Sequence, residues 1–266
     1  MVGSLVALVL ALVVFLGSYE HATGLKSIYF MRIDLSNISA SAVQGIPSDI
    51  AAAVDQQIPN IMQTLGISDF YDAGTNGYCQ GTDNTTGQVI TECFTPHMPF
   101  WFDFVSILEN NTNTGIQINL PSEVKDYEKV LHAASVGMWV CYVVGIVVSA
   151  LAVVSGIFAI CSRFAACCAS IISVVAFLAL LLASALATGI FVTYRKEFNN
   201  QLDSFGAVAS LNGGTYVLTW VSVAASLWAA FWWFVAMCCG KSSRRREVYQ
   251  EEKQPFIGYV PHQGPF

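Results

Sequence analysis

The chain has 266 residues, of which 55% are hydrophobic and 11% are charged, and its mean hydropathy is +0.56. Soluble domains carry about 25% charged residues, so this composition excludes an ordinary soluble protein and indicates that much of the chain faces lipid. The formal net charge is -6, and no basic surplus points to a nucleic-acid partner.

The first segment, Val2–Gly17, is almost wholly aliphatic and carries no charge. At about 1.5 Å per residue it is barely long enough to cross a bilayer, unless Ser18 and Tyr19 join it. A cleaved signal peptide is the alternative, but a signal peptide has a positively charged N-terminal region and a cleavage site of small residues. No Lys or Arg precedes Lys26, so residues 1–19 are predicted to form a retained first transmembrane helix.

A long region, residues 20–132, follows and is expected to lie outside the cell. Residues 28–34 are rich in strand-forming side chains. Residues 48–65 have apolar side chains at near-helical spacing, in a helix that Pro59 should kink or divide. Residues 121–131 are typical of an amphipathic helix with proline in its first turn, leading into the next span.

Two cysteines in this region, Cys79 and Cys93, flank a turn-rich cluster at residues 83–87. The runs on either side favour two short strands, so the pair is placed to close a hairpin. A disulfide there would remove about 3 kcal/mol of loop entropy from the unfolded chain and would indicate an oxidising compartment. Two unpaired buried thiols are the alternative.

Glycosylation sequons also point to the lumenal side of the membrane, because attachment takes place there. All the sequons of the chain fall in residues 20–132, and their acceptors are Asn37, Asn84 and Asn110.

Three further apolar stretches are predicted to span the membrane. They are residues 133–160, 165–193 and 215–239, with a second extracellular loop at 194–214 and a cytosolic tail at 240–266. Only four residues join the second and third spans, so an antiparallel helical pair is expected. The predicted fold class is an all-α membrane protein, a four-transmembrane-helix bundle with a small disulfide-pinned extracellular β-hairpin or sheet.

The distribution of basic residues sets the predicted orientation. Arg195 and Lys196 lie on one side of the membrane, while Arg163 and a basic run lie on the other, which favours both termini in the cytosol. The basic run consists of Lys241, Arg244, Arg245 and Arg246. It is a candidate for contact with anionic lipid, including phosphoinositides, and a topology signal is the alternative. Cys238 and Cys239 abut it and are candidates for S-palmitoylation, unless they are simply small apolar residues of the bundle.

None of the four spans contains Asp, Glu, Lys, Arg or His, which argues against a pump, a coupled transporter or an intramembrane protease. Small residues recur at spacing four in the last three spans, and they permit close helix contacts within one bundle or between copies. The four histidines are scattered, and no glycine-rich phosphate loop occurs. We therefore predict a protein that is not an enzyme and has no cofactor or metal.

Several motifs resemble those of a known family. They are Arg32–Ser39, Asp69–Tyr71, Gly74, Tyr78–Gly81, Cys93 and Phe100–Asp103. With the order of the spans, they resemble the claudin-like tetraspan superfamily and, more closely, the fungal Sur-seven/PalI family of plasma-membrane proteins. Claudin-like loops carry Gly-Leu-Trp before the first cysteine, but Thr75 and Asn76 follow Gly74 here. An aromatic anchor is then expected from Phe70, Tyr71 or Trp101.

The resemblance implies one of two functions. One branch of the family is eisosome-associated, organises a cortical domain of the plasma membrane, and affects endocytosis and cell-wall integrity. The other is PalI-like, assists sensing of ambient pH and often carries a long cytosolic tail. The short tail, 240–266, favours the first branch. The implied partners are membrane lipids such as phosphoinositides or sphingolipids, further copies or other membrane proteins, and the cell wall.

Overall fold

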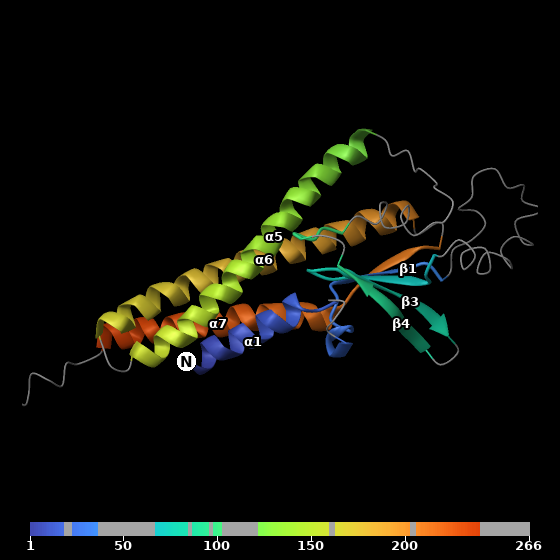
Figure 1. Ribbon diagram of the computed structural model, residues 1–266. Coiled ribbons are helices and arrows are strands. Elements are labelled where there is room, and N and C mark those ends of the chain that lie inside the picture. Colours follow the sequence, from blue (N-terminus) through green and yellow to red (C-terminus); the bar gives the residue numbers. More distant parts are fainter. Residues whose placement is uncertain are drawn as a thin grey trace, which may run out of the picture.

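The protein is an elongated helical bundle with a β-sheet at one end (Figure 1). The computed structural model describes residues 1–18, 23–36, 67–84, 87–95, 98–102, 122–159, 163–202 and 206–239. The helices are α1 (Val2–Phe15), α5 (Ser122–Ala159), α6 (Arg163–Leu202) and α7 (Gly213–Cys239), with a short 3-10 turn, η1, at Thr23–Leu25. The strands are β1 (Met31–Asp34), β2 (Phe70–Ala73), β3 (Tyr78–Asn84), β4 (Gly87–Phe94) and β5 (Val208–Leu211).

Three helices in the described part of the chain are long and apolar enough to cross a membrane. The segments that qualify are Lys129–Phe158, Ala166–Asn200 and Gly213–Cys238, within α5, α6 and α7. Helix α1 has 14 residues, or about 21 Å at 1.5 Å per residue, against a hydrocarbon core of about 30 Å. These helices indicate a multi-pass membrane protein, and the first predicted span is a shorter apolar helix than the three in the described residues that are long enough to cross.

Helix α1 ends before the predicted boundary at residue 19 because the chain turns sharply there. Ser18 has φ of 60°, and its hydroxyl donates a hydrogen bond to the carbonyl of Ile28 at 3.2 Å. A Cβ on Gly17 would lie 2.4 Å from the same carbonyl oxygen. Gly17 is therefore needed at this position, because a side chain would clash with the segment before β1 where it passes the end of α1.

Helices α5 and α6 form the predicted antiparallel pair, since α5 ends at Ala159 and α6 begins at Arg163. The expected extracellular helix and the second span are one continuous helix, α5, whose first turns lean away from the others (Figure 1). Helix α6 continues to Leu202, past the predicted end at residue 193. The predicted second extracellular loop therefore contains a helical extension and strand β5.

The sheet is antiparallel throughout, with strand order β4-β3-β2-β1-β5. The hairpin predicted around the cysteines is β3–β4, and the strand predicted at residues 28–34 is β1. Strand β5 pairs with β1 although Val208 and Asp34 are far apart in sequence. This pairing connects the sheet to the start of α7, because only Asn212 separates β5 from that helix.

The sheet and the bundle share one hydrophobic core. Phe30, just before β1, stacks on Phe191 of α6 with ring centroids 5.1 Å apart and meets Tyr216 of α7 edge-on at 5.3 Å. Buried Met31 and Ile33 of β1 belong to the same core. Because these aromatic contacts cross from sheet to helices, the outer sheet is held in a fixed orientation on the membrane helices.

Several predicted features lie outside the described residues. The helix at 48–65 and the acceptors Asn37 and Asn110 are among them, as are the tail and its basic run. Asn84 is the last residue of β3, and glycosylation at each acceptor stays a prediction.

Candidate functional site

The junction between the sheet and the helices begins at the disulfide. The predicted bridge between Cys79 and Cys93 is present, with sulfur atoms 2.08 Å apart, and these two residues are direct partners across the β3–β4 ladder. A sequence separation of 14 corresponds to about 3 kcal/mol in the chain-entropy account of disulfides. The bridge holds the hairpin closed next to the β2–β3 turn.

The β2–β3 turn, residues 74–77, caps the end of α1. The Thr75 hydroxyl donates to the carbonyls of Val14 and Phe15 at 3.2 and 3.0 Å, and the Asn76 amide donates to Phe15 at 3.1 Å. Helix ends leave their last carbonyls without partners inside the helix. The turn supplies those partners from a distant part of the chain, and a Cβ on Gly74 would lie 2.6 Å from the Ser18 Cβ.

Trp139 of α5 completes this junction. Its indole nitrogen donates to Asn76 Oδ1 at 2.7 Å, and its ring lies 6.0 Å from that of Phe15. The aromatic side chain beneath the turn is thus Trp139, which was not among the candidates expected from the sequence.

Those three candidates lie elsewhere in the fold. Phe70 and Tyr71 are buried in the sheet, and Trp101 meets His132 of α5 edge-on at 5.0 Å. Asn76 Oδ1 therefore accepts a hydrogen bond from an aromatic side chain of helix α5 rather than from one in the sheet or in the segment after β4.

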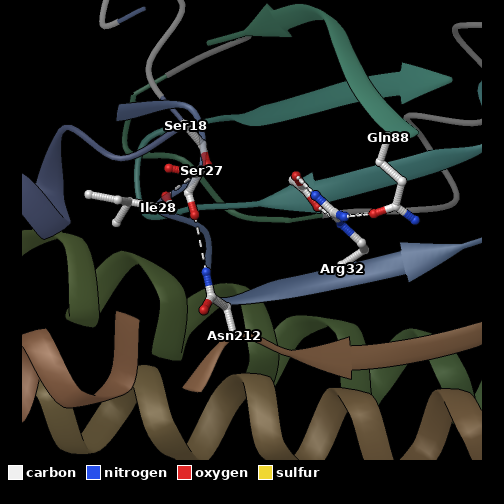
Figure 2. Close-up of polar contacts among 7 residues, drawn as sticks. Ser18, Ser27, Ile28, Arg32, Gln88 and Asn212 are labelled. Atoms are coloured by element: carbon white, nitrogen blue, oxygen red, sulfur yellow. Dashed lines mark hydrogen bonds and ion pairs between the residues drawn. The ribbon is translucent and has the colours of Figure 1, made fainter. Parts of the chain in front are cut away.

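An ion pair lies in the sheet beyond the junction. Arg32 of β1 donates to both carboxylate oxygens of Asp72 of β2, at 2.6 and 2.7 Å, and also to the Gln88 side chain of β4 (Figure 2). Its guanidinium lies 4.6 Å from the Tyr29 ring centroid and 4.3 Å from that of Phe70. The Asp72 side chain is 0% exposed and that of Arg32 15%. The pair thus ties three strands together.

Burial sets the electrostatics of this pair. Burial raises the pKa of the Asp72 carboxyl, and the Arg32 guanidinium offsets only part of that shift. Burial also raises the pKa of Tyr29. Because an ion pair with a buried partner gains little over apolar packing, we interpret the contact between Arg32 and Asp72 as one that specifies the register of β1 on β2.

Two asparagines hold β5 and the start of α7. Asn212 donates to the carbonyl of Ser27 at 3.1 Å (Figure 2) and accepts from the Gly214 amide at 3.1 Å, as an N-cap of α7. Asn199 of α6 donates to the Ala209 carbonyl at 3.0 Å and accepts from its amide at 2.7 Å. Strand β5 is therefore held by Asn199 of α6 at its middle and by Asn212 at the residue that follows it.

Polar contacts inside the bundle hold the helices together. The Thr219 hydroxyl lies 2.7 Å from that of Tyr142 and 2.8 Å from that of Ser184, which joins α5, α6 and α7. Ser222 donates to the Ala7 carbonyl at 3.0 Å, and Gly145 faces Leu180. Small residues at these positions thus make contacts within one bundle, one of the two interpretations that the sequence allowed.

The outer surface of α7 carries large aromatic side chains. We define the α7 aromatic face as Trp220, Trp228, Phe231, Trp232 and Phe234, which are 42 to 59% exposed. Trp228 and Trp232 pack edge-on with centroids 5.6 Å apart. This face points away from the core.

The free cysteines of α6 and α7 belong to no metal centre in the part of the chain that the structure describes. No group of three or more His, Cys, Asp or Glu side chains is close enough to hold an ion there. Cys238 is exposed at the end of α7, and Cys167 and Cys168 are half-buried in α6. Palmitoylation of Cys238 and Cys239 stays a prediction.

These features define a multi-pass membrane protein that carries a disulfide-pinned sheet at one end of its helical bundle. A family model described as the SUR7/PalI family matches residues 1–232. The chain belongs to the SUR7/PalI family, a family of structural membrane proteins, as its motifs predicted.

A curated relative supports the same conclusion. The chain is 24% identical over 261 residues to the SUR7 family protein pun1 of Schizosaccharomyces pombe, an alignment that covers 86% of this chain and 89% of the relative. No solved structure matches the chain.

Sequence reasoning missed Trp139, Asn199 and Asn212. Asn212 precedes a Gly-Gly pair and an apolar run, a pattern typical of a helix N-cap that could have been found. Trp139 and Asn199 gave no such signal, because their partners lie 63 and 10 residues away in the chain.

Proposed function

We propose that this protein organises a lateral domain of the fungal plasma membrane, of the eisosome type, without catalysing a reaction. In this proposal it associates with other membrane proteins or with further copies, and thereby affects endocytosis and cell-wall integrity. The observation that carries the proposal is the α7 aromatic face, which is exposed on the outside of a full-length membrane helix.

Tryptophan is unusual near the middle of a membrane helix. Tryptophan in membrane proteins concentrates at the two interfaces, whereas Trp228 lies near the middle of α7 and is 59% exposed. Association of membrane helices depends on close packing rather than on the hydrophobic effect. Rigid rings offer a large contact area with little loss of rotamer entropy, so this face suits a lateral contact.

The attachment of the sheet to helix α7 supports the same function. Strand β5 leads into α7 through Asn212, and Phe30 packs against Tyr216 of the same helix. A lateral contact made by α7 would therefore fix the orientation of the outer sheet as well. A patch of associated copies would then present a regular array of sheets toward the cell wall.

The tail, residues 240–266, supports the same proposal from the predicted cytosolic side of the membrane. With both termini in the cytosol, the basic run from Lys241 to Arg246 follows directly on α7. Each basic residue near an anionic surface adds about 1 kcal/mol of attraction. Phosphoinositide-rich or sphingolipid-rich regions would then gather the protein, and acylation of Cys238 or Cys239 would strengthen that preference.

Imaging of a fluorescently tagged full chain in fungal cells, beside a marker of plasma-membrane furrows, tests the proposal. We expect static cortical patches that coincide with the marker and recover slowly after photobleaching. Replacing Trp228 and Trp232 by Leu should disperse the patches. Phe158→Leu, an exposed aromatic on α5, is the matched control and should leave them intact.

Two outcomes would contradict the proposal. A uniform, freely diffusing distribution of the wild-type protein would remove its basis. Recruitment of endosomal-sorting factors that depends on ambient pH, without static patches, would instead favour the PalI-like alternative, an accessory component of pH signalling.

A further inference from the structure

Each of the four helices carries the same short pattern, a serine followed three residues later by an alanine. The two positions lie on one face of a helix, and in this bundle the four faces meet. The eight residues line a single cavity of about 10 Å³: Ser4, Ala7, Ser149, Ala152, Ser173, Ala176, Ser226 and Ala229.

Three of the four serines have buried hydroxyls without a partner. Ser4, Ser149 and Ser173 are 4, 2 and 3% exposed, and none of these hydroxyls has a hydrogen-bond partner among the described residues. The fourth, Ser226, donates to the carbonyl of Val223 in its own helix at 2.7 Å. A hydroxyl buried inside a membrane bundle is costly when it has no hydrogen-bond partner.

We propose that this cavity is a hydration site that holds one water molecule between the four helices. Its volume of about 10 Å³ is near the minimum that one water molecule needs, and buried water typically makes about three hydrogen bonds to groups that otherwise lack partners. Ser4, Ser149 and Ser173 supply three hydroxyls from three helices, and each can donate or accept. The lining carries no charge, so it suits a neutral ligand rather than an ion.

The site would attach α1 to the bundle. Helix α1 is short and presents Ser4 and Ala7 to the cavity, and its direct side-chain hydrogen bond to α7 runs from Ser222 to Ala7. A water bound by Ser4, Ser149 and Ser173 adds a link from α1 to α5 and α6. This inference concerns the bundle interior and is independent of the α7 aromatic face.

A specific alternative exists for the three hydroxyls. Serine and threonine in helices can bond to a carbonyl of the preceding turn, as Ser155 does with Ala152 at 3.1 Å and Thr188 does with Ser184 at 2.7 Å. If Ser149 and Ser173 turned in the same way, they would need no water. The test must therefore detect the water itself.

Magnetisation transfer from water to alanine methyl groups provides that test, measured on the full chain in lipid nanodiscs with labelled alanine. We expect cross-peaks from water to the cavity methyls of Ala7, Ala152, Ala176 and Ala229. The control methyls are those of Ala183 and Ala187, which are fully buried on either side of the paired Ser184 hydroxyl. They should show none, and they also report any transfer relayed through a serine hydroxyl.

A variant makes the assignment specific to this cavity. Ala152→Val adds methyl groups where the water would lie, so the cross-peaks at Ala7, Ala176 and Ala229 should disappear while the rest of the spectrum is retained. Absence of water cross-peaks at the cavity methyls of the wild-type protein would overturn the proposal, whether or not the variant folds. Cross-peaks that persist unchanged in a folded Ala152→Val variant would overturn it as well.

Discussion

The indole nitrogen of Trp139 lies 2.7 Å from the Oδ1 atom of Asn76, and this hydrogen bond joins the membrane helix α5 to the β2–β3 turn. The Asn76 amide in turn donates to the last carbonyl of α1, on Phe15. A single side chain thus connects α1, α5 and the disulfide-pinned hairpin.

Replacing Thr75 by Val should destabilise the protein measurably. The change removes the hydroxyl that donates to Val14 and Phe15 and leaves buried carbonyls with fewer partners, which costs about 1–3 kcal/mol. Thermal unfolding of the purified protein in nanodiscs measures the loss. Thr91→Val is the matched control, since the exposed Thr91 hydroxyl also donates to a carbonyl, that of Gln80. Equal shifts for both variants would count against the cap.

Trp139→Phe keeps an aromatic ring next to Phe15 but removes the donor to Asn76. We expect the single variants Trp139→Phe and Asn76→Ala each to lose about 1 kcal/mol or more of stability, because each breaks a part-buried hydrogen bond. The double variant should lose clearly less than the sum, since both changes remove the same bond. Strict additivity in this double-mutant cycle would mean that the two residues do not act together.

The Asp72 carboxyl gives the sheet a pH dependence with a defined sign. Burial raises the pKa of Asp72 in the folded protein above its value of about 3.9 in an unfolded chain. The folded state therefore binds more protons, so the stability linked to this group is complete below the unfolded pKa and is lost as pH rises through the folded pKa. The melting temperature of the wild type should rise relative to Asp72→Asn as pH falls from about 7 toward about 4. A difference that does not change with pH would contradict this.

Glycosylation mapping tests the orientation. We expect glycan at Asn84 and Asn110, and at Asn37 if the membrane surface leaves it accessible, because all three acceptors fall in residues 20–132, the region predicted to lie outside the cell. Glycosidase treatment should increase the mobility of the wild type, and Gln variants at the three acceptors should remove the shift. A glycan on a sequon engineered into residues 240–266 would reverse the predicted topology.

Much of the fold followed from local patterns in the sequence. Cys79 and Cys93 flank a turn cluster between two strand-forming runs, and the hairpin, its bridge and the α5–α6 pair appear as expected. Strand β5 could not be predicted, because its four residues lie between two spans and pair with β1 from the other end of the chain. Helix α1 is shorter than its apolar run because the chain turns sharply at Ser18, and the contacts from Thr75 and Asn76 at that end are remote in sequence.

The candidate site was less predictable than the fold. Trp139 lies in an apolar run and carries no local signal that its nitrogen meets Asn76, so only the packing of α5 against the turn reveals the contact. Small residues were expected at helix contacts, but spacing alone does not distinguish contacts within a bundle from contacts between copies. Burial of Ser222 and Ser226 against α1, together with exposure of Trp228, makes that distinction.

The central claim is that this membrane protein associates laterally through the α7 aromatic face. Counting photobleaching steps of the labelled full chain in liposomes, as the protein-to-lipid ratio is lowered, measures this directly. We predict that wild type and the Phe158→Leu control stay in multi-step assemblies at ratios where the double variant Trp228→Leu, Trp232→Leu bleaches in single steps. Single-step bleaching of the wild type at every ratio, or identical distributions for wild type and the double variant, would contradict the account.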